Sequence, residues 1–308
     1  MMKKIALFCF LSLYAEKIDI IANFDFDEIS PRAKIAQETG FELRSLRHSG
    51  FENYMQSFYT PDVKKIFLMN DVWPAADVAK LPKEKLVLFS WEPGLPREDY
   101  CDLFSRVYTL HDVVLDGVRY FKFYYPTLRP TSSPLLPFEE RQLCTMVASC
   151  ARDDRIKIIK FFETKPVEDF AFYGFIPLIP SDRYRGTIAG VPWSPEKVAL
   201  LQQYRFCICF EGCSCSGFIT EKIFVCFTAG CIPIYWGAPN IEEYIPKDCF
   251  ISYDDFESDE HLYHFLKTMS KETYQQYLNN ILSFLQTKQA HLFSQEHLSE
   301  IIYEAATH

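Results

Sequence analysis

The sequence predicts an α/β protein with two domains, each built around a parallel sheet. Short apolar segments of strand length alternate with segments of helical periodicity along most of the chain, which is the pattern of βαβ units. The chain has 308 residues, and a prior of roughly 150 residues per domain suggests two domains. A stretch rich in Pro and Ser at residues 126–137 separates two alternating regions and has the composition of an interdomain linker.

The first domain is expected over residues 1–130. Its short apolar segments are typical of strands, and the segments with helical spacing lie between them. The predicted strands are residues 5–13, 41–46, 63–69, 85–89, 106–110 and 120–125. The predicted helices are residues 27–39 and 73–80.

The second domain is expected over residues 138–257, and residues 258–308 are expected to form helices that pack on both domains. The predicted strands are residues 143–149, 170–175, 206–210, 231–236 and 249–252. The predicted helices of the domain are residues 153–163, 194–203 and 220–229, with a helical turn at 240–244. The helices predicted after it are residues 261–269, 271–286 and 295–306.

Residues 1–15 allow two interpretations. Lys3 and Lys4 followed by an apolar run resemble a short signal peptide, whereas a first strand explains the same run. Eleven cysteines, an odd number scattered singly, do not resemble a disulfide framework in a chain of this size. We therefore favour the strand and a cytoplasmic location, which is compatible with peripheral association with a membrane.

Charge and hydropathy argue against two classes of partner. The formal net charge is −9, and a nucleic-acid-binding face needs clustered Lys and Arg. No run approaches the roughly 20 apolar residues of a membrane span. An anionic ligand must therefore meet a local basic pocket.

Residues 204–237 combine strand, loop, helix and strand signals. A buried strand is followed by a loop rich in Gly, Ser and Cys, then by a helix with Thr220 at its N-cap and Gly230 at its C-terminal end. A right-handed crossover makes the two strands parallel neighbours. The loop and the helix N-terminus, where Lys222 lies, present free N–H groups suited to a phosphate or pyrophosphate.

The same stretch contains four closely spaced cysteines. Cys207, Cys209, Cys213 and Cys215 could be read as zinc thiolates, but the CxxC spacing typical of such sites is missing. We therefore favour Cys207 and Cys209 as small buried side chains of a strand.

Outside this stretch, position indicates two further functional residues. Glu92 follows the strand predicted at residues 85–89, and ligands of α/β sheets gather at the carboxyl ends of strands. Arg155 stands in the first turn of the helix predicted at residues 153–163, after another strand. Taken alone, each residue is also compatible with a solvated surface position, and for Arg155 that position is the more common one.

Several segments together resemble the family 10 glycosyltransferases, the α-1,3/1,4-fucosyltransferases. The segments that carry the resemblance most strongly are Phe210-Glu211, 217–223 (GFITEKI), 229–237 (AGCIPIYWG) and 244–247 (YIPK). Weaker matches, in the order typical of the family, are 91–93 (WEP), 120–122 (YFK), Arg155 with 161–163 (FFE), 173–175 (YGF) and 184–186 (YRG). The resemblance covers roughly residues 85–256.

This resemblance implies a GT-B architecture, in which two Rossmann-like domains face a cleft. The N-terminal domain would bind the acceptor and the C-terminal domain would bind GDP-fucose. Family members are inverting enzymes, which need a carboxylate to accept the proton of the acceptor hydroxyl and groups that stabilise the departing diphosphate. The implied acceptor is a hydroxyl of an oligosaccharide or glycolipid, in a GlcNAc or Glc unit and in α-1,3 or α-1,4 linkage.

The resemblance also implies roles for individual residues. Glu92 matches the general base, Arg155 and Lys222 match residues that neutralise the diphosphate, and Glu221 matches the carboxylate that holds the ribose. The remaining expected donor contacts are Gly212, Gly217, Phe218 and Thr220, with Arg152 and Arg185 as secondary basic contacts. No metal is required by this scheme, so Mg²⁺ or Mn²⁺ would be accessory at most.

Two positions depart from the family pattern. Gly212 stands where the family usually has asparagine, and Phe218 stands where tyrosine is common, so one amide and one phenol contact are missing. These departures keep two alternatives open: a transferase for a different nucleotide sugar, and a non-catalytic module that binds nucleotide sugars or glycans. Acceptor choice is expected to depend on loops at residues 47–59 and 71–79.

Overall fold

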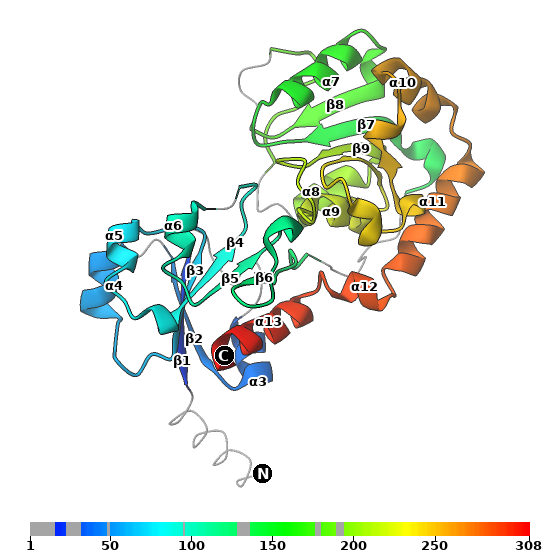
Figure 1. The fold of residues 1–308 in the computed structure, drawn as a ribbon. Coiled ribbons are helices and arrows are strands. Elements are labelled where there is room, and N and C mark those ends of the chain that lie inside the picture. Colours follow the sequence, from blue (N-terminus) through cyan, green and yellow to red (C-terminus); the bar gives the residue numbers. More distant parts are fainter. Residues whose placement is uncertain are drawn as a thin grey trace. The chain divides into compact units, whose positions relative to one another are not determined.

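The computed structural model describes residues 16–22, 32–47, 50–94, 96–127, 136–175, 180–188 and 194–308. The strand expected at residues 5–13 and the first part of the helix expected at residues 27–39 lie outside the described residues. Contacts along the chain divide it into two compact units. The first is Met1–Pro126 with Leu292–His308, and the second is Thr127–His291 (Figure 1).

The first unit holds a six-stranded sheet in which all neighbouring strands are parallel. In sheet order the strands are β2 (Glu42–Arg47), β1 (Lys17–Ala22), β3 (Lys65–Met69), β4 (Leu86–Ser90), β5 (Arg106–Thr109) and β6 (Tyr120–Lys122). The helices are α3 (Arg32–Thr39), α4 (Phe51–Ser57), α5 (Ala75–Val78), α6 (Glu98–Cys101) and α13 (Gln295–Thr307). Every residue of β3 and β4 is buried, as expected for parallel strands covered on both faces.

Strand β1 is an element that the sequence does not predict. Asp19 interrupts its apolar pattern, yet this carboxylate is fully buried. Arg44 on the neighbouring strand β2 donates to Asp19 Oδ1 at 2.6 Å and Oδ2 at 2.8 Å, and the Tyr54 hydroxyl donates to Oδ2 at 2.6 Å. The charge is tolerated in the core because it is paired and hydrogen-bonded.

Helix α4 corrects the expectation of a loop at residues 47–59. Its buried residues, Phe51 and Tyr54, are three positions apart and therefore lie on one face of the helix. Trp73 packs against both rings, with centroid distances of 5.4 Å and 5.1 Å. This aromatic contact stabilises a short helix whose sequence has no strong capping signal.

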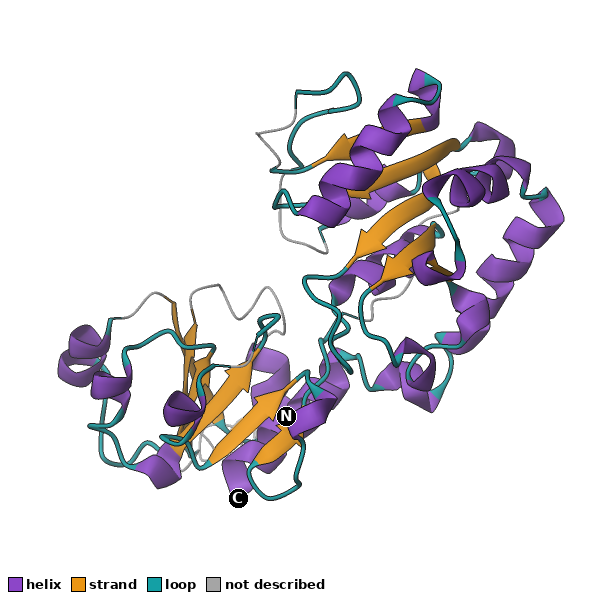
Figure 2. Cartoon of the chain, turned by 45° about the horizontal axis from the view of Figure 1, so that its top comes forward, coloured by secondary structure: helices purple, strands orange, loops and turns teal. Residues whose placement is uncertain are grey.

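The second unit holds a five-stranded sheet that is also parallel throughout. In sheet order the strands are β11 (Ile251–Ser252), β10 (Ile232–Trp236), β9 (Tyr204–Phe210), β7 (Gln142–Val147) and β8 (Phe170–Tyr173). The helices are α7 (Asp153–Glu163), α8 (Pro195–Leu201), α9 (Glu221–Ala229), α10 (Asp259–Thr268), α11 (Lys271–Phe284) and α12 (Lys288–His291). Figure 2 shows the strands of each unit accompanied by helices.

The last helix, α13, belongs to the first unit although it follows the helices of the second. It packs on α3, and the ring of Tyr303 lies 5.8 Å from that of Phe41. Glu304 pairs with Arg106 of β5 at 3.1 Å. The C-terminal helices are therefore shared between the units: α10, α11 and α12 belong to the second and α13 to the first.

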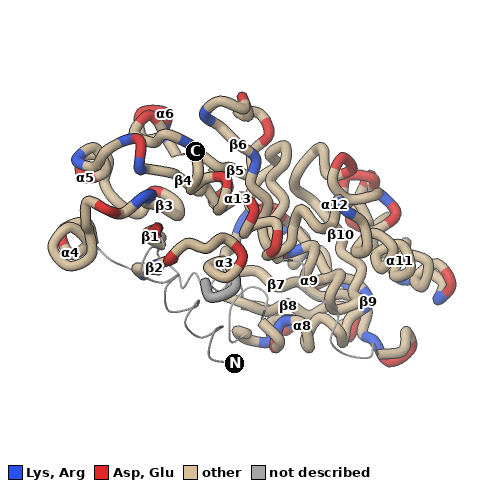
Figure 3. The backbone as a smooth tube through the Cα atoms, turned by 90° about the horizontal axis from the view of Figure 1, so that it is seen from below, with Lys and Arg blue, Asp and Glu red and all other residues tan. Residues whose placement is uncertain are grey.

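The charges and hydropathy of the described residues add two observations. Lys and Arg are interspersed with Asp and Glu in both units (Figure 3). No helix within the described part of the chain is long and apolar enough to cross a membrane.

Candidate active site

Strand β9 and helix α9 meet at a buried acidic residue, Glu211. This residue follows β9 directly and is fully buried. Its Oε1 accepts the backbone N–H of Thr220 at 2.8 Å, and its Oε2 accepts the Thr220 hydroxyl at 2.7 Å and Lys222 Nζ at 3.0 Å. Glu211 therefore fixes the N-terminus of α9 to the carboxyl end of β9.

Thr220 occupies the N-cap position of α9, as the sequence predicts, but its side chain makes no capping hydrogen bond. Its hydroxyl instead donates to Glu211 and accepts a hydrogen bond from Lys222 at 2.8 Å. Thr220 is also buried. Its hydroxyl thus belongs to an internal network with these two charged residues.

Lys222 carries the exposed positive charge of this network. Its side chain is 27% exposed, and its ammonium lies 3.8 Å from Glu221 Oε1 in addition to its contacts with Glu211 and Thr220. Burial alone would lower the pKa of Lys222, but the Glu211 and Glu221 carboxylates outweigh burial and raise this pKa. The ammonium is therefore charged throughout the neutral pH range.

Glu221 is the first residue of α9 and is buried. Burial works to raise the pKa of Glu221, whereas Lys222 and Lys197 lower it and prevail. The helix N-terminus also favours a negative charge at this position. Glu221 is therefore an ionised carboxylate.

Arg155 and Arg152 connect the loops at the carboxyl ends of the strands. Arg155 on α7 is buried and donates to the carbonyl oxygens of Phe210 at 3.0 Å and Cys150 at 3.3 Å. Arg152, the N-cap residue of α7, donates to the carbonyl oxygen of Gly212 and lies 5.6 Å from the ring centroid of Trp236. Both guanidinium groups thus bind the protein's own backbone in this structure.

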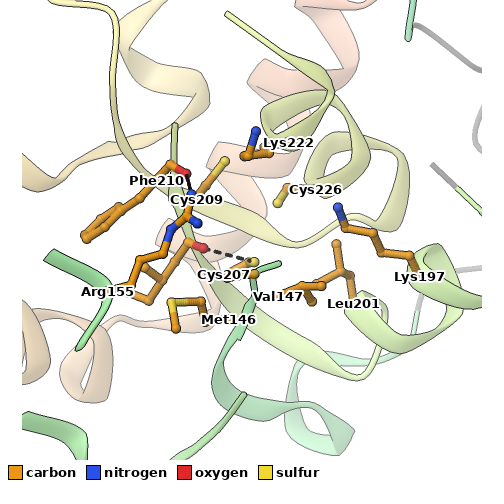
Figure 4. A pocket seen from close by; sticks show the side chains of 12 residues that line it. Met146, Val147, Arg155, Lys197, Leu201, Cys207, Cys209, Phe210, Lys222 and Cys226 are labelled. Carbon is orange, nitrogen blue, oxygen red and sulfur yellow. Dashed lines mark hydrogen bonds between the residues drawn. The ribbon is translucent and has the colours of Figure 1, made fainter. Parts of the chain in front are cut away.

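A small cavity lies at this edge of the second sheet. Its lining includes Arg155, Lys197 and Lys222 together with the ends of β7 and β9 (Figure 4). Its volume is about 10 Å³, about the space of one water molecule. Three cationic side chains thus border one cavity beside the α9 N-terminus.

Lys197 is a basic residue of this cavity that sequence reasoning missed. It lies in the first turn of α8, and Ser194 caps that helix by accepting the Lys197 N–H. Helix α8 packs on α9, which brings Lys197 close enough to Glu221 to lower its pKa. The only signal in the sequence is a lysine near a helix start, which by itself indicates no ligand.

Glycines shape the loop around Glu211. Gly217 has φ +77°, a left-handed conformation that favours glycine, and its N–H donates to Asn240 Oδ1 at 2.8 Å. Gly237 ends the segment 229–237 identified in the sequence, where it was assigned no role. It has no room for a side chain, since a Cβ there would lie 2.6 Å from Glu211 Cγ. The third glycine, Gly212, offers its carbonyl to Arg152.

Phe218 and Arg185, both expected to contact the donor, interact with other parts of the protein in this structure. Phe218 is 2% exposed, so its ring packs inside the protein. Arg185 is exposed and donates to the carbonyl oxygen of Asp182 at 2.5 Å within its own loop. Its neighbour Arg183 is buried and donates to the carbonyl oxygen of Lys165 at 2.7 Å, which is a structural contact.

Glu92 belongs to the first unit, two residues after β4, and is exposed. Asn70 Nδ2 lies 3.4 Å from its Oε1. The ring Nε2 of His111 lies 3.4 Å from its backbone oxygen. Burial lowers the pKa of His111, so this ring is neutral at neutral pH. Neither Asn70 nor His111 was identified from the sequence.

The cysteines of the described residues are free thiols. Cys207 and Cys209 are buried on β9, as the interpretation of this segment as a strand predicts. Across the described ranges, no group of three or more His, Cys, Asp or Glu side chains is arranged to hold a metal ion.

Much of the second unit matches a known protein family. Residues 182–300 match the model described as glycosyltransferase family 10 (fucosyltransferase), C-terminal. The matched region contains β9, α9 and β10, and therefore the whole Glu211 network. This finding confirms the resemblance identified in the sequence.

Curated relatives match over parts of their length. The chain is 33% identical to Alpha-(1,3)-fucosyltransferase B of Drosophila melanogaster over 94 residues, 30% of this chain and 21% of that protein. It is 26% identical to Alpha-(1,3)-fucosyltransferase FucT of Helicobacter pylori over 186 residues, 56% and 38% respectively. It is 41% identical to GDP-fucose protein O-fucosyltransferase 3 of Xenopus laevis over 49 residues, 16% and 10%. The matches thus span less than half of each relative.

Solved structures establish the fold. A crystal structure of an alpha1,3-fucosyltransferase with GDP has a TM-score of 0.60 and 15% identity, covering 96% of this chain and 92% of that one. The lipopolysaccharide outer core galactosyltransferase WaaB has a TM-score of 0.51 and 10% identity, covering 92% and 99%. The predicted α/β fold of the GT-B class is confirmed.

Proposed function

Because residues 182–300 match the model of the family 10 glycosyltransferases, we propose that the protein is a fucosyltransferase with GDP-fucose as its donor. It transfers L-fucose, with inversion, to a hydroxyl of a glycan acceptor. The observation that carries the proposal is the network of Glu211, Thr220 and Lys222 at the N-terminus of α9. It lies inside the matched segment and combines a fixed positive charge with a helix N-terminus.

This network suits the diphosphate of the donor. Lys222 stays charged and partly exposed while two of its hydrogen bonds hold it to buried groups. A preorganised cation and the N–H groups of a helix N-terminus stabilise a departing diphosphate without a metal ion. Glu221, ionised beside Lys222, is proposed to accept the ribose hydroxyls, and Lys197 supplies further positive charge to the same cavity.

Arg155 contributes to the same site in a different way. Two of its hydrogen bonds go to the carbonyl oxygens of Phe210 and Cys150, so its guanidinium is held in place at the carboxyl end of β9. Its Nη1 also donates to Cys150 Sγ at 2.9 Å. A guanidinium has five donors, and those outside these three contacts are proposed to bind phosphate oxygens. Arg152 contacts Gly212 and Trp236. It is proposed to order the loop that contains Gly212, and Arg155 is proposed as the phosphate ligand.

Glu92 is proposed as the general base. The acceptor oxygen attacks the anomeric carbon of fucose as its proton passes to the Glu92 carboxylate. The bond from that carbon to the GDP oxygen breaks, and GDP leaves with the electron pair. Glu92 is exposed after the carboxyl end of β4, a position where α/β sheets place reacting groups, and Asn70 contacts one of its oxygens.

The direct test replaces Glu92 with glutamine and Glu98, an exposed acid on α6, with glutamine as the matched control. Transfer from labelled GDP-fucose should fall by a factor of about 10² to 10⁴ in Glu92→Gln, the range for general base catalysis. GDP-fucose affinity, measured by calorimetry, should stay the same in both variants. Full transfer by Glu92→Gln would show that Glu92 is not the general base. If the unaltered protein bound GDP-fucose but neither transferred nor hydrolysed it, the protein would be a non-catalytic module.

A different nucleotide sugar is the second candidate donor. Gly212 brings no side-chain amide to the loop and Phe218 brings no phenol oxygen, and the Gly212 carbonyl is already bound by Arg152. Thermal shift with GDP-, UDP- and CMP-sugars separates the donors. Stabilisation by GDP-fucose supports the proposal, and stabilisation by a UDP-sugar alone would overturn it.

The acceptor is proposed to be a GlcNAc or Glc unit of an oligosaccharide or glycolipid. Two of the relatives named above are α-1,3-fucosyltransferases, whereas the third is a protein O-fucosyltransferase. An acceptor array should therefore contain GlcNAc-terminated and Glc-terminated glycans, glycolipids and folded protein domains. Fucose transfer to protein hydroxyls alone would replace the glycan proposal.

A further inference from the structure

Asn70 has an unusual backbone conformation at the end of β3. It is the residue after Met69, and it is the only non-glycine residue with positive φ, +67°, within the described ranges. Asparagine tolerates the left-handed region better than most residues, but glycine adopts it without steric cost. The backbone conformation alone therefore does not require asparagine at this position. The contacts of the side chain have to be considered as well.

The side-chain amide of Asn70 is oriented by a backbone group of the neighbouring strand. Asn70 Oδ1 accepts the backbone N–H of Trp91 at 2.7 Å, and the backbone N–H of Asn70 donates to the carbonyl oxygen of Phe89 at 2.8 Å. A backbone N–H can only donate, so the amide oxygen must face Trp91. The amide NH₂ group is thereby directed to the other side, where Glu92 Oε1 lies at 3.4 Å.

His111, two residues after the end of β5, contacts the same segment. Its Nε2 lies 3.4 Å from the backbone oxygen of Glu92, and the residue is 4% exposed. Asp71 is the next residue after Asn70, and the ion pair of Lys122 with Asp112, at 2.8 Å, acts electrostatically on His111. The group that contacts the Glu92 carboxylate, the Asn70 side-chain amide, is itself uncharged.

We propose that Asn70 is a positioning residue for Glu92: its NH₂ group holds Oε1 and leaves Oε2 for the acceptor hydroxyl. The inference rests on the proposed role of Glu92 as general base. A distance of 3.4 Å is long for a hydrogen bond, but such bonds shorten when substrate binds.

The test is Asn70→Asp, a change of nearly equal size. Aspartate still accepts the Trp91 N–H and tolerates the left-handed backbone, but it places a negative charge beside Glu92 in place of a donor. A neighbouring like charge raises the pKa of a carboxyl group, so the ionised base forms only at higher pH. The acid limb of kcat/KM should therefore move up by about one pH unit. At pH 7 kcat should also fall about tenfold, because the NH₂ group that orients the carboxylate is lost.

The matched control is Asn279→Asp, the same chemical change at an exposed position of α11. This variant should keep the pH profile of the unaltered protein. The GDP-fucose dissociation constant should be unchanged in Asn70→Asp, because Asn70 acts on the base and not on the donor. An unmoved acid limb together with an unchanged kcat would overturn the inference.

A second variant covers failure of Asn70→Asp to fold. Asn70→Gly adopts the left-handed backbone freely and removes both amide contacts, so it should lower kcat at unchanged GDP-fucose affinity. In a Glu92→Gln background neither change at position 70 should reduce transfer further, because residues that act through one another are not additive. Further loss there would indicate a general structural role and would contradict the inference.

The same experiments separate the inference from the proposed function. If Glu92→Gln is inactive and both Asn70 variants match the unaltered protein, the positioning role is wrong while the general base stands. If Glu92→Gln is fully active, the base assignment itself is wrong, and the positioning role is overturned with it.

Discussion

Among the described residues, each unit of the protein contains a carboxylate with 0% exposure that is held by a cation and a hydroxyl group. In the first unit Asp19 is bound by Arg44 and Tyr54. In the second unit Glu211 is bound by Lys222 and Thr220. The chemistry of the two networks is similar, and the difference lies in where the carboxylate stands along its strand.

Asp19 lies inside β1, and its partner Arg44 is the cross-strand neighbour on β2. Both oxygens of Asp19 are bound by Arg44, and Tyr54 connects this pair to α4. Glu211 follows the last residue of β9, where the sheet ends and α9 begins. Its partner Lys222 therefore faces the edge where ligands of parallel sheets bind. A buried ion pair within a strand thus serves stability, whereas one at the end of a strand can also present a charge to a ligand.

The largest expected effect is on stability, from Asp19→Ala. Removal of one partner leaves Arg44 and Tyr54 without their acceptor, and breaking a buried pair costs about 3 kcal/mol in the free energy of unfolding. Urea denaturation measures this change, with Asp62→Ala as a control because Asp62 forms an exposed pair with Lys17. GDP-fucose affinity should remain unchanged. Weakened donor binding in Asp19→Ala would break the distinction between the two networks.

Lys222→Met should act mainly on the donor. Removal of one preorganised charge at a leaving group costs a factor of about 10² to 10³ in kcat. Transfer assays measure this loss, and calorimetry with GDP measures the accompanying loss of affinity. Lys271→Met, at an exposed lysine paired with Glu139, is the matched control. Normal transfer and normal GDP affinity in Lys222→Met would assign the Glu211 network to stability alone.

Glu221→Gln should have the smallest effect on stability, and that effect should depend on pH. The folded protein lowers the pKa of Glu221 despite its burial, because Lys222 and Lys197 lie nearby. The resulting stabilisation is present above the unfolded pKa of about 4.3 and is lost as pH falls through the lower folded value. The variant should thus be less stable than the unaltered protein at pH 7, with a smaller difference near pH 3.

Urea midpoints at the two pH values measure this change. Glu257→Gln, whose side chain is 90% exposed, should show no such pH dependence. A difference for Glu221→Gln that grows on acidification would contradict the assigned direction of the pKa shift.

Elements with an uninterrupted apolar pattern were predictable. The strands β4 and β9 and the helix α7 lie where the sequence predicts them, because periodicity reports burial directly. Strand β1 and helix α4 were not predicted, since each depends on a partner distant in sequence: Asp19 on Arg44, and Phe51 on Trp73.

The candidate site shows the same division. Lys222 and Glu221 were predictable because a loop followed by a helix N-terminus is a local signal for anion binding. Lys197 and Asn70 were not, since a lysine in a helix and an asparagine after a strand are common in any protein. The sequence predicts a phosphate contact for Arg155, but it could not predict the hydrogen bond from Arg155 to the Phe210 carbonyl oxygen. That bond joins residues 55 positions apart.

By itself, the sequence determined the alternation of strands and helices, the β9–α9–β10 unit and the resemblance to the family 10 glycosyltransferases, whose model matches residues 182–300. These properties are local, because they depend on periodicity, capping and the order of motif residues. Only the tertiary structure decided which charges are paired: that Glu211 holds Lys222, that Arg155 binds backbone carbonyls, and that Asn70 faces Glu92. The physical reason is that hydrogen bonds act over about 3 Å, and only folding brings such distant residues to that distance.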